Sequence, residues 1–212
     1  MLMTLSIRRS LRAPLAAKRR FYLFPVLLTL LSGCATQQPT ERPTQWNTHE
    51  QALRQLDHYQ AKGKLGYKGQ QRFGANLLWE TTASHDHLLL TNFLGSTLLK
   101  LDARPSQVTL INNEGKTFQG VNADQLVQQL TGIDLPVTQM RDWLIGLPTA
   151  ADTFQLNNNG RVSYLAKQIN DKLWQLDYNE YDYSTTPALP KRMVLSTTGV
   201  SITLVIHSWS IN

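Results

Sequence analysis

The sequence predicts a mainly β domain with some α structure, in which about eleven antiparallel strands curl into a barrel or a strongly bent sheet. Three observations predict it. Apolar and polar residues alternate along many short segments, turn-rich stretches separate these segments at roughly ten-residue spacing, and two amphipathic helical patterns interrupt the series in the middle. So many strands must curl to hide their apolar face, and the helices are natural covers for the open side.

The first 33 residues are typical of an export signal. Six basic residues and no acidic one precede an apolar stretch from Phe21 to Leu31, and small residues follow it. This stretch is too short for a transmembrane helix, which needs about 20 apolar residues. We therefore expect residues 1–33 to be a signal peptide that is removed.

The signal ends in Leu31-Ser32-Gly33-Cys34, which resembles the lipobox of bacterial lipoproteins. The resemblance implies cleavage before Cys34, a thioether-linked lipid on its sulfur and an acylated amino group. The alternative is a chance cysteine behind an ordinary signal, which the shape of the whole segment disfavours. Because Cys34 is the only cysteine of the chain, no disulfide framework is expected.

The positive charge of the chain belongs to the signal. The whole sequence has 21 Lys and Arg against 15 Asp and Glu, but six basic residues leave with residues 1–33 and no acidic residue does. Fifteen basic and fifteen acidic residues remain, so the mature chain is neutral with its histidines uncharged. This balance gives no support for nucleic-acid binding, which needs a basic patch that survives processing.

Residues 34–46 are rich in Gln, Pro, Thr and Arg, a composition that cannot form a core and predicts a lipidated flexible tether. We expect residues 47–212 to form a single domain. Thr48 and Gln51 have capping-box spacing, which predicts a short helix up to about Tyr59.

The strands follow from alternation with a period of two. In residues 71–81, for example, Phe73, Ala75, Leu77 and Trp79 share one face. Six strands are expected before the central helices, at 62–68, 71–81, 85–92, 97–103, 107–112 and 116–121. Five are expected after them, at 154–157, 161–168, 173–180, 192–197 and 201–208. The Asn-rich run at 157–160 is a strong hairpin turn.

Two helices are expected between the strand series. Asn122 can cap the first, which carries apolar Leu126, Val127 and Leu130 and stops at Gly132. The second follows Pro136 and stops at Gly146. Its apolar positions are Val137, Met140, Trp143 and Leu144.

No catalytic or nucleotide-binding motif is present in the sequence, so we expect neither an enzyme nor a cofactor. Ser84, His85 and Asp86 are adjacent in sequence, where side chains point apart and cannot form a relay. His85 and His87 share one strand face, but no third or fourth ligand is suggested nearby, so surface histidines are favoured over a metal site.

The turn at 92–96 is unusual because Phe93 and Leu94 stand where a hairpin tip normally carries polar residues. Two interpretations remain open at this point. The side chains can fold inward over the end of the core, or they can form an apolar probe directed toward lipid or an apolar partner.

The lipobox and three further segments together resemble the LolB family of outer-membrane lipoprotein receptors. The segments are LLLTNFLGST at 88–97, LTG at 130–132 and WLIGLP at 143–148. Phe93 departs from the family pattern, in which a proline is expected, while Leu94 matches the projecting leucine. The resemblance implies an incomplete, unclosed antiparallel β-barrel of eleven strands, with helices covering the opening and an apolar cavity inside.

The same resemblance implies a receptor that accepts lipoproteins from the periplasmic carrier LolA and inserts them into the outer membrane. Its partners would be this carrier, lipoprotein acyl chains and outer-membrane phospholipid, and we expect a monomer that faces the periplasm of a Gram-negative bacterium. Phe93 and Leu94 would form the insertion loop, and Ala35 fits this location because an aspartate there is the usual retention signal of the inner membrane. The residues expected to line or cover the cavity are Phe73, Leu77, Leu99, Leu126, Leu130, Met140, Trp143 and Leu144.

Two other classes of function remain open. A lipid-anchored scaffold or assembly subunit would have the same fold with its interior packed solid. A lipid-modifying enzyme would show a polar catalytic cluster inside the cavity.

Overall fold

The computed structural model describes residues 42–132 and 135–211. The predicted signal peptide, Cys34 and the first part of the predicted tether lie outside the described residues. Within the described part of the chain, no helix is long and apolar enough to cross a membrane.

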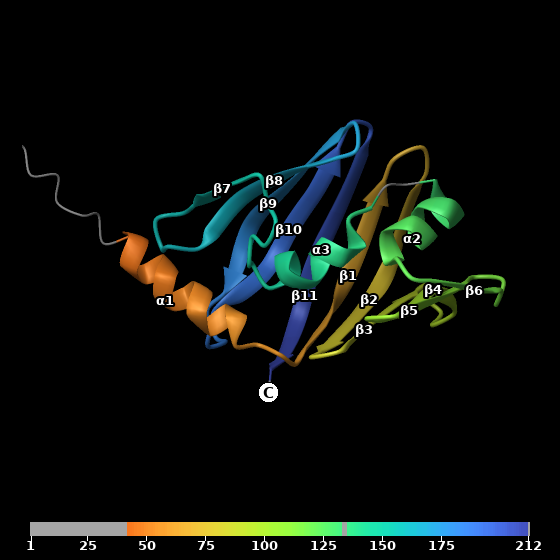
Figure 1. Ribbon diagram of the computed structural model, residues 1–212, viewed down its shortest axis with the longest axis horizontal. Helices are drawn as coiled ribbons and strands as arrows, with labels where there is room; N and C mark the ends of the chain where they lie inside the picture. The colour runs from red at the N-terminus through yellow and green to blue at the C-terminus, as the bar shows by residue number, and fades with distance from the viewer. Residues whose placement is uncertain (1–41, 133–134, 212) are drawn as a thin grey trace, which may run out of the picture. The chain divides into compact units, whose positions relative to one another are not determined.

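Eleven antiparallel strands form one sheet in the order β6-β5-β4-β3-β2-β1-β11-β10-β9-β8-β7 (Figure 1). The strands before the crossover are β1 (Tyr59–Lys68), β2 (Arg72–Thr82), β3 (His85–Thr91), β4 (Thr97–Arg104), β5 (Gln107–Asn112) and β6 (Thr117–Gly120). Those after it are β7 (Thr153–Leu156), β8 (Val162–Ile169), β9 (Lys172–Asp182), β10 (Leu189–Thr197) and β11 (Val200–Ile211). The number of strands and their places in the sequence confirm the prediction.

The connectivity explains why the sheet stays unclosed. The chain enters at the centre with β1, moves strand by strand to the edge at β6, and crosses through two helices to the other edge at β7. It then returns to the centre, where β11 pairs with β1. The edges β6 and β7 do not pair with each other, and the two crossover helices occupy the connection between them (Figure 1).

The crossover helices are α2 (Ala123–Thr131) and α3 (Val137–Leu144), as the sequence predicts. The Asn122 side chain accepts a hydrogen bond of 3.0 Å from the Gln125 amide, which caps α2. Gly132 ends this helix with a φ of 71°, a left-handed conformation that glycine adopts without a steric penalty.

The first helix begins earlier than predicted. Helix α1 covers Arg42–Arg54 rather than 48–59, so residues 42–46 of the predicted tether are helical. The physical reason is a distant contact: the Trp46 side chain is only 7% exposed, and its ring lies 5.7 Å from that of Phe154 on β7. Proline is tolerated in the first turn of a helix, so Pro43 does not prevent this start.

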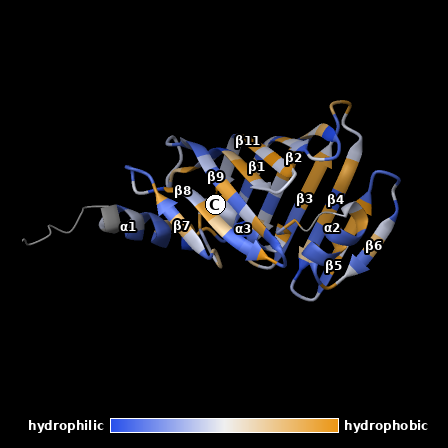
Figure 2. Cartoon of the chain, turned by 90° about the horizontal axis from the view of Figure 1, so that it is seen from above, coloured by the Kyte–Doolittle hydropathy of each residue, from blue (hydrophilic) through white to orange (hydrophobic). Residues whose placement is uncertain are grey.

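The inner face of the sheet and the crossover helices form one apolar core. Figure 2 shows the alternation of hydrophobic and hydrophilic residues along the strands that produces it. On the side of β8 to β10 the core is tightly filled, with Trp143, Trp174 and Leu176 fully buried. The Tyr178 hydroxyl donates a 2.7 Å hydrogen bond to the Trp143 carbonyl, which fixes the end of α3 against β9.

Candidate functional site

An apolar cavity of about 70 Å³ lies between α2, α3 and the inner face of the central strands. Its walls consist entirely of apolar residues. Those from the strands are Leu65, Leu77, Trp79, Leu88, Leu90, Leu99, Leu195, Ile202 and Leu204. Those from α2, α3 and the segment between them are Val127, Leu135, Val137 and Met140. Such a lining offers contact and burial to hydrocarbon without hydrogen bonds that would select one ligand.

Three of the predicted cavity residues line this space: Leu77, Leu99 and Met140. Leu126 is buried and Leu130 is partly buried in the core beside the cavity, without lining it. The other ten residues of its wall were not among the predicted cavity residues. Strand alternation is the signal that could have identified Leu65, Leu88 and Leu90, which face the cavity.

Phe73, Trp143 and Leu144, which were also expected to line or cover the cavity, do not line this space. Trp143 and Leu144 have no exposed surface and belong to the packed part of the core. The Trp143 indole N–H donates to the Thr149 carbonyl at 2.9 Å, so this ring is held away from the cavity. Phe73 is 46% exposed and lies near the tip of the β1–β2 hairpin, stacked on Tyr67.

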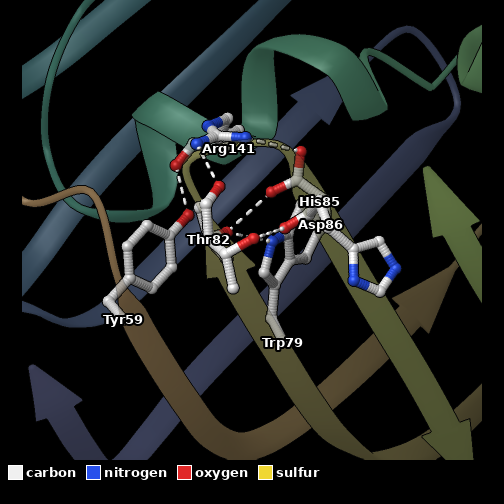
Figure 3. A network of polar contacts seen from close by, with 7 residues as sticks. Tyr59, Trp79, Thr82, His85, Asp86 and Arg141 are labelled. Carbon is white, nitrogen blue, oxygen red and sulfur yellow. Dashed lines mark hydrogen bonds and ion pairs between the residues drawn. The ribbon is translucent and has the colours of Figure 1, made fainter. Parts of the chain in front are cut away.

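A polar network fastens α3 over the cavity (Figure 3). Arg141 of α3 forms an ion pair of 3.1 Å with Asp86 of β3, and its second terminal nitrogen donates to the Thr82 carbonyl at 2.7 Å. The Tyr59 hydroxyl of β1 donates to the Arg141 carbonyl. One helical residue is thereby joined to the ends of three strands.

The same network extends into the sheet. Thr81 donates a 2.7 Å hydrogen bond to Asp86 and accepts one of 3.2 Å from the Trp79 indole. Burial raises the pKa of Tyr59 far above its ordinary value, so its hydroxyl stays protonated and can donate. No local sequence pattern predicts this network, because Arg141 and Asp86 are 55 positions apart.

His85 and His87 point to one shared carboxylate. Their ring nitrogens lie 3.1 and 2.9 Å from the same oxygen of Asp102, and the Lys100 amine lies 3.5 Å from the other oxygen. Partial burial raises the pKa of Asp102. The hydrogen bond and charge of His87, together with the charge of Lys100, outweigh this effect and hold that pKa below its ordinary value. In the described part of the chain, no three His, Cys, Asp or Glu residues could hold a metal ion together.

The turn between β3 and β4 directs its apolar side chains into solvent. Phe93 is 87% exposed and Leu94 75% exposed, so neither folds over the core. The Asn92 side chain accepts hydrogen bonds from the amides of Leu94 and Ser96 at 2.9 and 3.0 Å. Gly95 adopts a φ of 85°, which completes a compact three-residue loop with a left-handed glycine. Phe93 is therefore compatible with this loop although a proline was expected there.

Comparisons with known proteins agree with this architecture. The profile of the family described as "LolB: Outer membrane lipoprotein LolB" matches residues 57–209. The outer-membrane lipoprotein LolB of Vibrio parahaemolyticus is 38% identical over 198 residues, which cover 91% of this chain and 98% of that protein. That of Yersinia enterocolitica is 38% identical over 202 residues, which cover 92% and 98%.

Solved structures share the fold at much lower identity. A LolA superfamily protein from Nitrosomonas europaea aligns with a TM-score of 0.50 at 8% identity, covering 82% of this chain and 94% of that one. A DUF1329 family protein from Desulfovibrio piger aligns with the same score and coverage at 5% identity. These two likenesses establish the fold alone.

Proposed function

Because the chain belongs to the LolB family of outer membrane lipoproteins, we propose that it is a lipoprotein receptor of the outer membrane. It accepts lipoproteins from a periplasmic carrier of the LolA type, shelters their acyl chains in the apolar cavity and inserts them into the outer membrane. The observation that carries this proposal is the cavity, whose walls are entirely apolar and belong to both the sheet and the helices.

The energetics favour an exchange between apolar environments. Hydrocarbon transfer contributes about 0.8 kcal/mol per CH₂, so exposing one acyl chain of roughly fifteen methylenes to water costs on the order of 12 kcal/mol. The sequence contains no nucleotide-binding motif that could supply this energy. Cargo therefore passes from carrier to cavity to bilayer with its acyl chains shielded at each step.

The cavity must widen to accept an acyl chain. Its volume of about 70 Å³ is far below the 300–1,000 Å³ of pockets that hold drug-sized ligands. We propose that α3 and α2 move away from the sheet when cargo enters. This movement breaks the contacts of Arg141 with Asp86 and with the Thr82 carbonyl (Figure 3). The charged side chains of Arg141 and Asp86 are already partly exposed to water.

The anchor completes the proposal. Removal of residues 1–33 and lipidation of Cys34 would hold the domain at the periplasmic face of the outer membrane, where delivery takes place. No helix among the described residues could span that membrane.

The exposed turn fits the delivery step. Phe93 and Leu94 are largely exposed, and the charge-free turn that carries them is held by two hydrogen bonds to the Asn92 side chain. Burying such a side chain in a bilayer contributes roughly 1.5–3 kcal/mol, which is modest for anchoring and sufficient to favour a transfer step.

Mixing the purified protein with carrier-bound lipoprotein tests the proposal. Cargo should move from the carrier to the protein, and from the protein to added phospholipid vesicles, without any nucleotide. If the cargo stays on the carrier at every protein ratio and temperature tried, the chain is not a receptor.

A further inference from the structure

A second part of the molecule faces the same direction as the Phe93–Leu94 turn. The hairpins β1–β2, β3–β4 and β5–β6 all turn at one end of the sheet, which we call the tip end. The last β2–β3 pair before this end joins Asn76 to Thr91, and the Asn76 side chain donates to the Asn92 carbonyl at 3.2 Å. The β1–β2 hairpin continues beyond that pair, beside the turn.

The tip of the β1–β2 hairpin carries two unbalanced positive charges. Lys68 and Arg72 are exposed and directly opposite each other in the ladder. Like charges at such positions destabilise a sheet. Within the described residues, neither forms an ion pair. By contrast, the charges at the β5–β6 tip neutralise each other, because the Lys116 amine lies 2.8 Å from Glu114.

The other face of this hairpin presents an aromatic pair. Tyr67 and Phe73 are opposite each other in the next register position, with ring centroids 5.0 Å apart and planes inclined by 21°. Phe73 is 46% exposed although it continues the inward row of Ala75 and Leu77. Aromatic rings beside basic residues are the composition of segments that lie at a membrane interface.

We propose that Lys68 and Arg72 form a docking site for the anionic headgroups of a phospholipid bilayer. The proposal rests on the function proposed above, in which the neighbouring turn inserts into that bilayer. It explains the unpaired cations by charge complementarity: their mutual repulsion is relieved when phosphate groups lie against them. Phe73 then lies at the level of the interface.

The test measures binding of the mature chain, residues 34–212, to vesicles by co-sedimentation. Cys34→Ala removes the acylation site, so that a lipid anchor does not mask the contact. Vesicles of phosphatidylcholine are compared with vesicles in which phosphatidylglycerol replaces part of it, at low and at high salt. The wild-type sequence should bind the anionic vesicles more tightly, and this preference should weaken with salt because added ions screen the charges.

The double variant Lys68→Gln and Arg72→Gln should lose that preference. Each basic residue near an anionic surface contributes about 1 kcal/mol, so affinity for the anionic vesicles should fall about 30-fold. Affinity for phosphatidylcholine should stay the same. The matched control is Lys62→Gln with Arg104→Gln, which removes two other cations that have no ion pair within the described residues. This control should bind both kinds of vesicle like the wild type.

A charge reversal separates docking from folding. Arg72→Glu places opposite charges across the ladder, so the hairpin should be at least as stable as before while anionic vesicles bind more weakly.

The proposal is overturned if the double variant binds anionic vesicles as well as the wild type, or if the control variant loses as much affinity as the double variant. It is also overturned if these variants impair only acceptance from the carrier, since the cations would then serve the carrier. The vesicle measurement contains neither carrier nor cargo, so its result is independent of whether the chain acts as a receptor.

Discussion

Two hairpin tips at the same end of the sheet have the same backbone and opposite side chains. In residues 92–96 and 112–116, an asparagine accepts hydrogen bonds from the amides two and four positions later, at 2.9–3.0 Å in both. A glycine closes each turn, with a φ of 85° at Gly95 and 76° at Gly115. Between them, one tip carries Phe93 and Leu94, and the other carries Asn113 and Glu114.

The comparison shows that the backbone does not require the apolar pair. In a third turn, at 157–161, the Asn157 side chain accepts the same two hydrogen bonds, and the tip carries Asn158 and Asn159. Among the described residues this turn thus occurs three times and carries apolar residues once, beside the basic tip of the β1–β2 hairpin. An exposed apolar pair that the turn does not need is best explained by what it contacts outside the molecule.

The largest effect is expected when one tip is converted into the other. Phe93→Asn with Leu94→Glu should slow delivery of bound cargo to vesicles by about 100-fold or more, because two insertions of roughly 1.5–3 kcal/mol each are lost. Acceptance from the carrier should be unchanged. Delivery at the wild-type rate would remove the turn from the mechanism.

A cavity variant should show the complementary defect. Leu90 lies on β3 just before the turn and lines the cavity. Leu90→Trp should reduce acceptance from the carrier about tenfold by filling that space, at a cost in stability of about 1–3 kcal/mol from overpacking. The control Leu90→Met conserves volume and should accept cargo normally. If both variants accept cargo like the wild type, acyl chains do not enter this cavity.

The two turns should respond equally to a change in their shared backbone. Gly95→Ala and Gly115→Ala should each lower the free energy of unfolding by about 1–2 kcal/mol, since alanine is strained at these φ values. Apart from the glycine and its two chain neighbours, no heavy atom lies within 4 Å of the position of either added Cβ, so the cost comes from the backbone alone. Denaturant unfolding of the two variants checks this, and clearly unequal losses would show that the turns differ in more than side chains.

The smallest effect is expected for the reverse conversion. Asn113→Phe with Glu114→Leu should change the free energy of unfolding by no more than about 0.5 kcal/mol, because the altered side chains are on the surface. Thermal unfolding at equal protein concentration measures this change. A large loss would mean that the turn does select its side chains, and the apolar tip would then need a structural explanation.

The sequence predicted the elements well because their signals are local. Asn122 and Gly132 delimit α2 where expected, and alternation placed the eleven strands. It could not predict that α1 starts at Arg42, since burial of Trp46 depends on Phe154 more than 100 positions away.

The cavity wall was predicted less well for a related reason. Leu77 and Trp143 are both apolar residues on inward faces, yet one borders the cavity and the other is packed against β9. The pattern of apolar residues predicts which way a side chain points. It does not predict whether neighbouring side chains fill the space in front of it. The contact of Arg141 with Asp86 likewise joins two segments whose proximity only the folded sheet creates.

Photo-crosslinking from the cargo's acyl chains tests the central claim most directly. A lipoprotein carrying a photoreactive group on its acyl chains is loaded on the carrier, passed to this protein and irradiated before vesicles are added. The account predicts adducts on residues around the cavity, such as Leu90, Leu99 and Met140. Cargo that transfers but crosslinks only to the outer face of the sheet would contradict it.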